Sequence, residues 1–256
     1  MSNNLLEVKN LSKSFGGLKA VSIDLLTFQK NQLTSIIGPN GAGKTTFFDL
    51  ISGFQNSDSG EIFFNGKEIT NIQPHKIARF GMVRTFQLTK VFDRMTVLEN
   101  LLFSGSSVKN DSFLKSFLNP PTQRNYEKEL QNRAYKVMEE LNIKHMANSY
   151  ARELSGGQKK LLELARSIIN NPDVLLLDEP LAGVNPKLAE EILSLILKLS
   201  QQGITIIMVE HNIEAVMKIS DRIVVLAEGS LIAEGNPSEI RSNKKVIEAY
   251  LGSENE

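Results

Sequence analysis

The segment at positions 38–45, with the sequence GPNGAGKT, constrains the fold of this chain most, because it fits the pattern G-x-x-x-x-G-K-[ST]. The apolar run at 33–37 predicts a buried strand before it, and the pattern at 46–52 predicts a helix that ends at Gly53. In that setting glycine backbones can surround phosphate oxygens, Lys44 can reach the β/γ-phosphates, and the Thr45 hydroxyl can ligate Mg²⁺. The alternative is a glycine-rich turn that only caps a helix. We predict a phosphate-binding loop formed by Gly38, Pro39, Asn40, Gly41, Ala42, Gly43, Lys44, Thr45 and Thr46.

The composition excludes several classes of protein. At 256 residues the chain has the size of one α/β nucleotide-binding domain with small subdomains. Its 29 Lys and Arg residues balance its 29 Asp and Glu residues, so we predict no nucleic-acid partner. Without cysteine it has no disulfide, thiolate metal site or cysteine nucleophile. No basic segment precedes the first apolar stretch, and the apolar runs are far shorter than the ~20 residues of a membrane helix, so we expect a cytoplasmic protein.

The hydrophobic pattern predicts an α/β fold. Strand patterns dominate the first 70 residues, and Asn65-Gly66 predicts a type I′ hairpin turn. Helical patterns begin at Thr96, where the sequence TVLE predicts a capping box, and they include an amphipathic helix at 126–141. A polar connection at 104–125, with one short helix at 113–118, is expected between them. From 159 onward helices and strands alternate, which predicts a mainly parallel sheet with an antiparallel return at 231–233.

Two adjacent carboxylates follow the apolar strand predicted at 174–177. This is the form expected of a strand that lies beside a phosphate loop. We predict that Asp178 holds Mg²⁺, directly or through water, and that Glu179 polarises the water that attacks the γ-phosphate. The alternative is a strand end with two solvated acids.

Four further sites carry weaker signals. His211 follows the strand at 204–209 and could orient the attacking water, or it could simply begin a helix. Gln87 could reach Mg²⁺ and water from the end of a strand. Phe15 could stack on adenine, or be an exposed loop aromatic. Finally, a helix that begins at Ser155, Gly156, Gly157 and Gln158 could bind an anion through its N–H groups and a hydroxyl, or merely carry an N-cap.

The order of these motifs resembles that of the ATP-binding subunits of ABC transporters, and the resemblance covers nearly the whole chain. It implies a P-loop NTPase core with an N-terminal antiparallel β-subdomain and a helical insert. The corresponding boundaries are 1–90 and 152–235 for the core with its β-subdomain, 91–151 for the helical subdomain and 236–256 for a C-terminal helical tail. The implied ligands are ATP and Mg²⁺, the latter held by Thr45, Gln87 and Asp178.

The resemblance also implies partners. ATP would lie between the phosphate loop of one subunit and Ser155, Gly156 and Gly157 of a second ATPase subunit, which is either a second copy or a paralogue. The helical insert would receive coupling helices of integral membrane permease subunits, so the protein would be peripheral on the inner face of the membrane and would act indirectly with a solute-binding protein. One departure is Asn185, where many members of the family have Asp.

Four segments are similar to those of branched-chain amino-acid importers: RTFQ at 84–87, MTVLEN at 95–100, GVNP at 183–186 and VIEAYLG at 246–252. The resemblance therefore implies an ATPase that drives import of branched-chain or related amino acids. One alternative is an ABC ATPase for another cargo, such as urea or exported lipopolysaccharide. Another is a soluble ABC ATPase that acts on ribosomes or DNA, although such proteins usually carry two cassettes or a long coiled-coil insertion.

Overall fold

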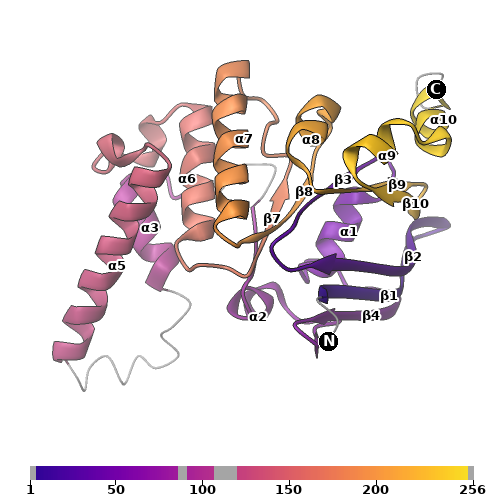
Figure 1. Cartoon of the computed structure of the whole chain (residues 1–256). Coiled ribbons are helices and arrows are strands. Elements are labelled where there is room, and N and C mark those ends of the chain that lie inside the picture. Colours follow the sequence, from indigo (N-terminus) through magenta and orange to yellow (C-terminus); the bar gives the residue numbers. More distant parts are fainter. Residues whose placement is uncertain (1–3, 86–90, 107–119, 253–256) are drawn as a thin grey trace. The chain divides into compact units, whose positions relative to one another are not determined.

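The computed structural model describes residues 4–85, 91–106 and 120–252 (Figure 1). It divides into two compact units. The first contains Met1–Arg84, Asp173–Leu181 and Leu193–Glu256, and the second contains Thr85–Pro172 and Ala182–Ile192. The first unit contains both sheets, and the second unit contains helices α3, α5 and α6.

The first unit contains an antiparallel sheet with the strand order β2-β1-β4-β5. The turn between its last two strands has φ of +51° at Asn65 and +73° at Gly66, as the predicted type I′ turn requires. The first strand is 12 residues long and pairs with two neighbouring strands along its length. The strands are β1 (Asn4–Phe15), β2 (Leu18–Gln29), β4 (Ser59–Phe64) and β5 (Lys67–Glu68).

A second sheet in this unit has the order β10-β9-β3-β8-β7-β6, and all its neighbours are parallel except β10 and β9. Every residue of β3, β7 and β8 is buried, as expected for strands covered on both faces. In this sheet β8 lies between β3, which precedes the phosphate loop, and β7, which precedes the two adjacent carboxylates. The strands are β3 (Leu33–Ile37), β6 (Met82–Arg84), β7 (Val174–Asp178), β8 (Thr205–Val209), β9 (Arg222–Ala227) and β10 (Ser230–Gly235).

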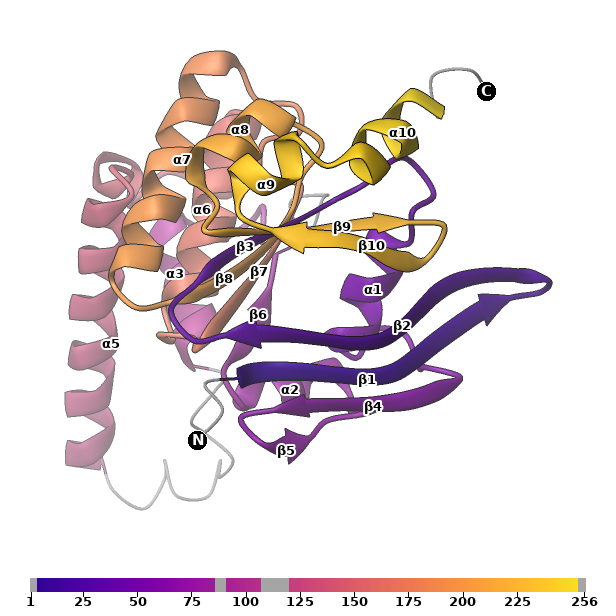
Figure 2. The same cartoon turned by 45° about the vertical axis from the view of Figure 1, so that its right-hand side comes forward.

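Helix α1 (Lys44–Ile51) lies between the two sheets of the first unit (Figure 2). Its Phe47 and Phe48 are fully buried in a core that both sheets share, and the Phe47 ring centroid lies 6.3 Å from that of Phe28 in β2. This burial of apolar surface on two sides fixes the helix that follows the phosphate loop. The other helices of this unit are α2 (Pro74–Arg79), α8 (Ile213–Ile219), α9 (Pro237–Arg241) and α10 (Lys244–Gly252).

The second unit is helical. Helix α3 (Val97–Ser106) packs on α5 (Pro120–Glu140) and α6 (Gly156–Ile168), and a Cβ added at Gly105 would lie 2.3 Å from Cδ1 of Leu130. Short 3₁₀ turns at Lys144–Met146 and Ala151–Glu153 connect α5 to α6. Helix α7 (Pro186–Gln201) contributes residues to both units.

The predicted capping box at the start of α3 is confirmed. The Thr96 N–H donates to Glu99 Oε2 at 2.7 Å, and the Glu99 N–H donates to Thr96 Oγ1 at 3.2 Å. Helix α5 begins six residues before the predicted position 126, and the helix predicted at 113–118 lies outside the described residues. Among the helices of the described residues, none combines the length and apolarity needed to span a membrane.

Replacing Gly38, which follows β3, tests how the phosphate loop packs on the sheet. A Cβ at this position would lie 2.0 Å from the carbonyl oxygen of Leu226 in β9, so the loop or the strand would have to move. We expect Gly38→Ala to lower the free energy of unfolding by at least about 2 kcal/mol, measured by urea denaturation.

Gly16→Ala is the matched control for this substitution. Gly16 also has a positive φ, of +57°, but a Cβ there would meet no atom within 4 Å. We therefore expect a loss of only about 1 kcal/mol. Equal losses in the two variants would contradict the close packing of Gly38 on β9.

Candidate functional site

The candidate site lies at the carboxyl ends of β3, β7 and β8. Because these strands are parallel, the segments that follow them emerge at the same edge of the sheet, which is where open α/β sheets bind ligands. A cavity of about 730 Å³ opens there, a volume typical of small-molecule sites. It is lined by Phe15, Leu18, Lys19, Ala20, Asn40, Gly41, Ala42, Gly43, Lys44, Thr45, Thr46, Glu179, His211 and Glu228.

The loop before α1 is held against two neighbouring segments. Gly43 has a φ of +91°, and a Cβ there would lie 2.2 Å from the carbonyl oxygen of Ala20 in β2. On the other side, the N–H of Gly229, in the turn between β9 and β10, donates to the carbonyl oxygen of Ala42 at 3.2 Å. Glycine is therefore required at position 43 both for backbone conformation and for space.

The Lys44 side chain is folded back into the same loop. Its Nζ donates to the carbonyl oxygens of Gly38 at 2.7 Å and Pro39 at 2.9 Å, and the residue is only 5 % exposed. Burial lowers the pKa of this ammonium below its usual value, and the negative charge of Glu179 acts in the opposite direction. The contacts place a positive charge within the loop that the sequence predicts to bind phosphate.

Glu179 and His211 both line the cavity and lie within hydrogen-bond distance of each other. The Glu179 Oε1 lies 3.1 Å from the His211 Nε2, and the carboxylate side chain is 15 % exposed. Glu179 has a φ of +49°, which is uncommon for a residue with a long side chain and carries backbone strain. Its N–H donates to the carbonyl oxygen of Val209 at 2.9 Å, which ties the end of β7 to the end of β8.

Asp178 is buried beside an arginine. The Arg84 Nη2 donates to Asp178 Oδ2 at 2.8 Å, and the Arg84 Nη1 donates to Asp49 Oδ1 of α1 at 2.6 Å. Since Asp178 is 5 % exposed and Glu179 is largely buried, the alternative of two solvated acids does not fit. Among the described residues no group of three or more acidic or histidine side chains could hold a metal. The Thr45 hydroxyl and the Asp178 carboxylate are oxygen groups of the type that suits Mg²⁺, which usually binds one or two protein oxygens together with phosphates and water.

The remaining predicted residues have different locations. Phe15 lines the cavity and is 49 % exposed, with Lys13 Nζ 5.5 Å from its ring centroid. Gln87 lies outside the described residues. Ser155 is the N-cap of α6 in the helical unit, and it exchanges hydrogen bonds with Gln158 at 2.8 and 3.3 Å. A Cβ at Gly157 would lie 2.0 Å from Leu188 Cδ2, whereas a Cβ at Gly156 would meet nothing within 4 Å.

Two residues at the carboxyl edge of this sheet, Arg84 and Tyr250, were not predicted from the sequence as part of the site. Arg84 ends β6 and bridges two carboxylates, and the signal for it is a charge at the end of a strand. Tyr250 of α10 forms a hydrogen bond with the backbone of Gly38, and the chain at the end of β3 passes next to α10 (Figure 2). Burial raises the pKa of the Tyr250 hydroxyl to about 12, and this hydrogen bond acts in the opposite direction. No local pattern predicts a contact between residues 212 positions apart.

Comparison with known families gives two matches. A family described as "ABC transporter" matches residues 21–182, and one described as "Branched-chain amino acid ATP-binding cassette transporter" matches residues 230–256. The first match includes the phosphate loop and the Asp178-Glu179 pair. The second covers β10 and the helices that follow it.

Individual relatives match along nearly the whole chain. The probable branched-chain amino acid transport ATP-binding protein LivG of Archaeoglobus fulgidus is 43 % identical over 98 % of this chain and 96 % of its own length. The high-affinity branched-chain amino acid transport ATP-binding protein BraF of Pseudomonas aeruginosa is 44 % identical over 98 % and 99 %. A crystal structure of the ADP conformation of an ATP-binding cassette of an ABC transporter has a TM-score of 0.83 and 38 % identity, covering 98 % of this chain and 100 % of that one. The predicted fold class is confirmed.

The buried ion pair between Arg84 and Asp178 gives a stability prediction. Methionine at this position would fill much of the same space but would leave the Asp178 carboxylate without the guanidinium. We expect Arg84→Met to lower the free energy of unfolding by about 3 to 5 kcal/mol in chemical denaturation. As a control, Lys9 lies 3.3 Å from Glu7 Oε1 but its side chain is 43 % exposed, so Lys9→Met should cost less than about 1 kcal/mol. Similar losses of unfolding free energy in Arg84→Met and Lys9→Met would show that the ion pair of Arg84 with Asp178 is not effectively buried.

Proposed function

The chain belongs to the ABC transporter family, and from this premise we propose that it is the ATP-hydrolysing subunit of an importer for branched-chain or related amino acids. The observation that carries the proposal is the 43–44 % identity, along nearly the whole chain, to ATP-binding proteins named for branched-chain amino acid transport. The match of residues 230–256 to a family of the same description supports the cargo independently of the nucleotide motifs.

ATP would bind with its phosphates on the loop at 38–46 and its adenine near Phe15. The inward-held Lys44 ammonium and the exposed Phe15 ring, both lining the same cavity, support this orientation. Mg²⁺ would be held by Thr45, Asp178 and Gln87, together with phosphate oxygens and water. When bound, the metal would neutralise charge that develops on the phosphates during hydrolysis.

Hydrolysis would be carried out by the pair of Glu179 and His211. The Glu179 carboxylate would accept a proton from, or polarise, the water that attacks the γ-phosphate. Its hydrogen-bond distance to His211 Nε2 supports a role for the histidine in orienting the carboxylate, the water and the γ-phosphate. Both side chains line the cavity that contains the phosphate loop, which supports their assignment to the same reaction.

A second ATPase subunit would complete the site. We propose a head-to-tail dimer in which Ser155, Gly156, Gly157 and Gln158 of one subunit cover the nucleotide of the other. The open space at Gly156 supports the approach of a ligand or partner there. Asn185 accepts a hydrogen bond from the Leu188 N–H at 2.9 Å, so in this subunit its side chain caps α7. At the dimer it would offer a neutral contact where many members of the family have Asp.

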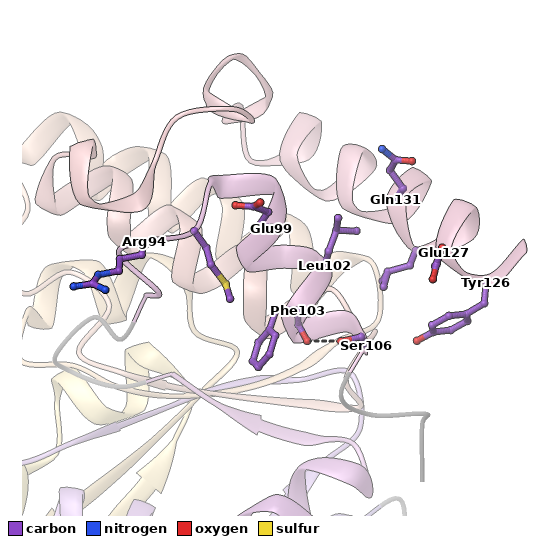
Figure 3. A pocket seen from close by; sticks show the side chains of 10 residues that line it. Arg94, Glu99, Leu102, Phe103, Ser106, Tyr126, Glu127 and Gln131 are labelled. Carbon is purple, nitrogen blue, oxygen red and sulfur yellow. Dashed lines mark hydrogen bonds between the residues drawn. The ribbon is translucent and has the colours of Figure 1, made fainter. Parts of the chain in front are cut away.

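Permease subunits would dock on the helical subdomain, which we place at 91–151, and would hold the protein on the inner face of the membrane. A cavity of about 640 Å³ in this part of the chain supports the proposal, and Figure 3 shows side chains of α3 and α5 that line it. Phe103 is 50 % exposed there and makes an edge-to-face contact with Phe92, with ring centroids 4.9 Å apart. The buried Asn100 donates to the carbonyl oxygens of Phe92, Met95 and Thr96, which makes this rim rigid. The occupant that fits is a short amphipathic helix with an apolar face.

Glu179→Gln tests the catalytic assignment. The amide cannot act as a base, so we expect ATP turnover to fall at least about 100-fold while ATP binding persists and a dimer accumulates. Phosphate release at saturating ATP and size-exclusion chromatography measure the two effects. Glu68→Gln, in the exposed strand β5, should leave turnover unchanged. Normal turnover of Glu179→Gln would exclude Glu179 as the base.

Phe103→Glu tests the docking surface. A negative charge in place of the exposed Phe103 ring should oppose burial of an apolar helix against it. We therefore expect that coexpressed permease subunits no longer copurify with this variant. Leu25→Glu is the control, because Leu25 is 54 % exposed on β2 and does not line this cavity. Its copurification should match that of the unaltered chain. Retention of the permease by Phe103→Glu would contradict docking at this cavity.

A further inference from the structure

Glu210 is a buried carboxylate that the proposed mechanism does not use. It follows β8 directly and is 4 % exposed. Within the described residues it forms no ion pair, and its charge is balanced by backbone donors instead. Its Oε1 accepts the Leu181 N–H at 2.8 Å, and its Oε2 accepts the N–H groups of His211 at 3.0 Å and Asn212 at 3.3 Å. Such donors stabilise a buried carboxylate strongly, so the arrangement is rigid.

The bond from Leu181 joins the two segments that carry the pair of Glu179 and His211, whereas the bonds from His211 and Asn212 lie within the segment after β8. Leu181 is two residues after Glu179, and His211 is next to Glu210. Separately, the Glu179 N–H is bound by the carbonyl oxygen of Val209, one residue before Glu210. Two residues at the end of β8 therefore hold Glu179. Val209 accepts its N–H directly, and Glu210 accepts the N–H of Leu181 in the chain that follows it.

The backbone of Glu179 needs such support. Its φ of +49° is a sparsely populated conformation that persists only where the surroundings fix it. The hydrogen bond from Leu181 to Glu210 restrains the chain directly after this strained residue. In the segment after β8, Asn212 caps α8 by accepting the Ala215 N–H at 3.0 Å. Because the Asn212 N–H in turn binds the Glu210 carboxylate, Glu210 also fixes the start of that helix.

We propose that Glu210 is a positioning residue for ATP hydrolysis, whose carboxylate clamps the segments after β7 and β8 and thereby sets the distance between Glu179 and His211. Glu210 does not line the nucleotide cavity, and both its oxygens accept backbone N–H groups, so it acts through the pair and not on the nucleotide. The inference rests on the proposed function, because it assigns a role in the same reaction.

Glu210→Gln separates this role from simple stabilisation. The amide keeps the size of the side chain but replaces one acceptor oxygen with an NH₂ group that faces a backbone donor. We expect the kcat of ATP hydrolysis by the full-length chain to fall at least about 10-fold, since misplacing reacting groups slows the chemical step. The KM for ATP and the affinity for a non-hydrolysable ATP analogue should change less than about 2-fold, because the hydrogen bonds of Glu210 go to Leu181, His211 and Asn212 and Glu210 does not line the cavity.

Asp221→Asn is the matched control. Asp221 Oδ2 accepts the Leu33 N–H at 2.8 Å, so it is also a carboxylate bound to a backbone donor, but it lies at the amino end of β3 and β9. We expect both variants to lower the thermal unfolding midpoint and only Glu210→Gln to lower kcat. An equal fall in kcat for the two variants, or none for Glu210→Gln, would overturn the proposal.

A double-mutant cycle with His211→Ala gives a second readout. If Glu210 acts by positioning the pair, Glu210→Gln should lower kcat much less in the His211→Ala chain than in the unaltered chain. Independent effects would overturn the proposal. If Glu210→Gln does not fold, Glu210→Asp, which keeps the charge but shortens the side chain, replaces it with the same expected outcomes. Failure of the unaltered chain to hydrolyse ATP would overturn the proposed function itself. Slow ATP turnover of the Glu179→Gln variant, together with an unchanged kcat of the Glu210→Gln variant, would overturn only the positioning role.

Discussion

The parallel pairing of β3, β8 and β7 is the constraint on which the site depends. Parallel strands end at the same edge, so the phosphate loop, Glu179 and His211 meet although they are far apart in the chain. The complete burial of these strands fixes their register, because a shift would expose apolar residues or bury polar ones. Helix α1, held between two sheets, then fixes the direction in which the phosphate loop leaves β3.

Three charged residues at this edge, Lys44, Asp178 and Glu210, are buried, and each is compensated in a different way. Lys44 is held by carbonyl oxygens of its own loop, Asp178 by the Arg84 guanidinium, and Glu210 by three backbone N–H groups. In a site of low dielectric such fixed partners restrict how the groups reorient. Transition-state stabilisation requires a preorganised arrangement of this kind, because the groups then need little reorientation during the reaction.

Each unit contributes a different part of the proposed cycle. The described lining of the nucleotide cavity comes from the first unit, whereas the helix start at Ser155 and the cavity between α3 and α5 belong to the helical unit. The helix start satisfies its own cap through Gln158, so it is preformed. The arrangement fits the proposed dimer, in which a second subunit supplies the helix start that covers ATP.

Local patterns in the sequence determined most elements and most candidate residues. The phosphate loop, the capping box at Thr96, the hairpin turn at Asn65 and the carboxylates after β7 depend on neighbouring residues, so spacing alone predicts them. Tertiary structure decided the strand order, which inserts β8 between β3 and β7, and the contacts of Arg84, Glu210 and Tyr250. These depend on segments up to 212 positions apart being brought together by burial of the two sheets and α1, and no local periodicity carries that information.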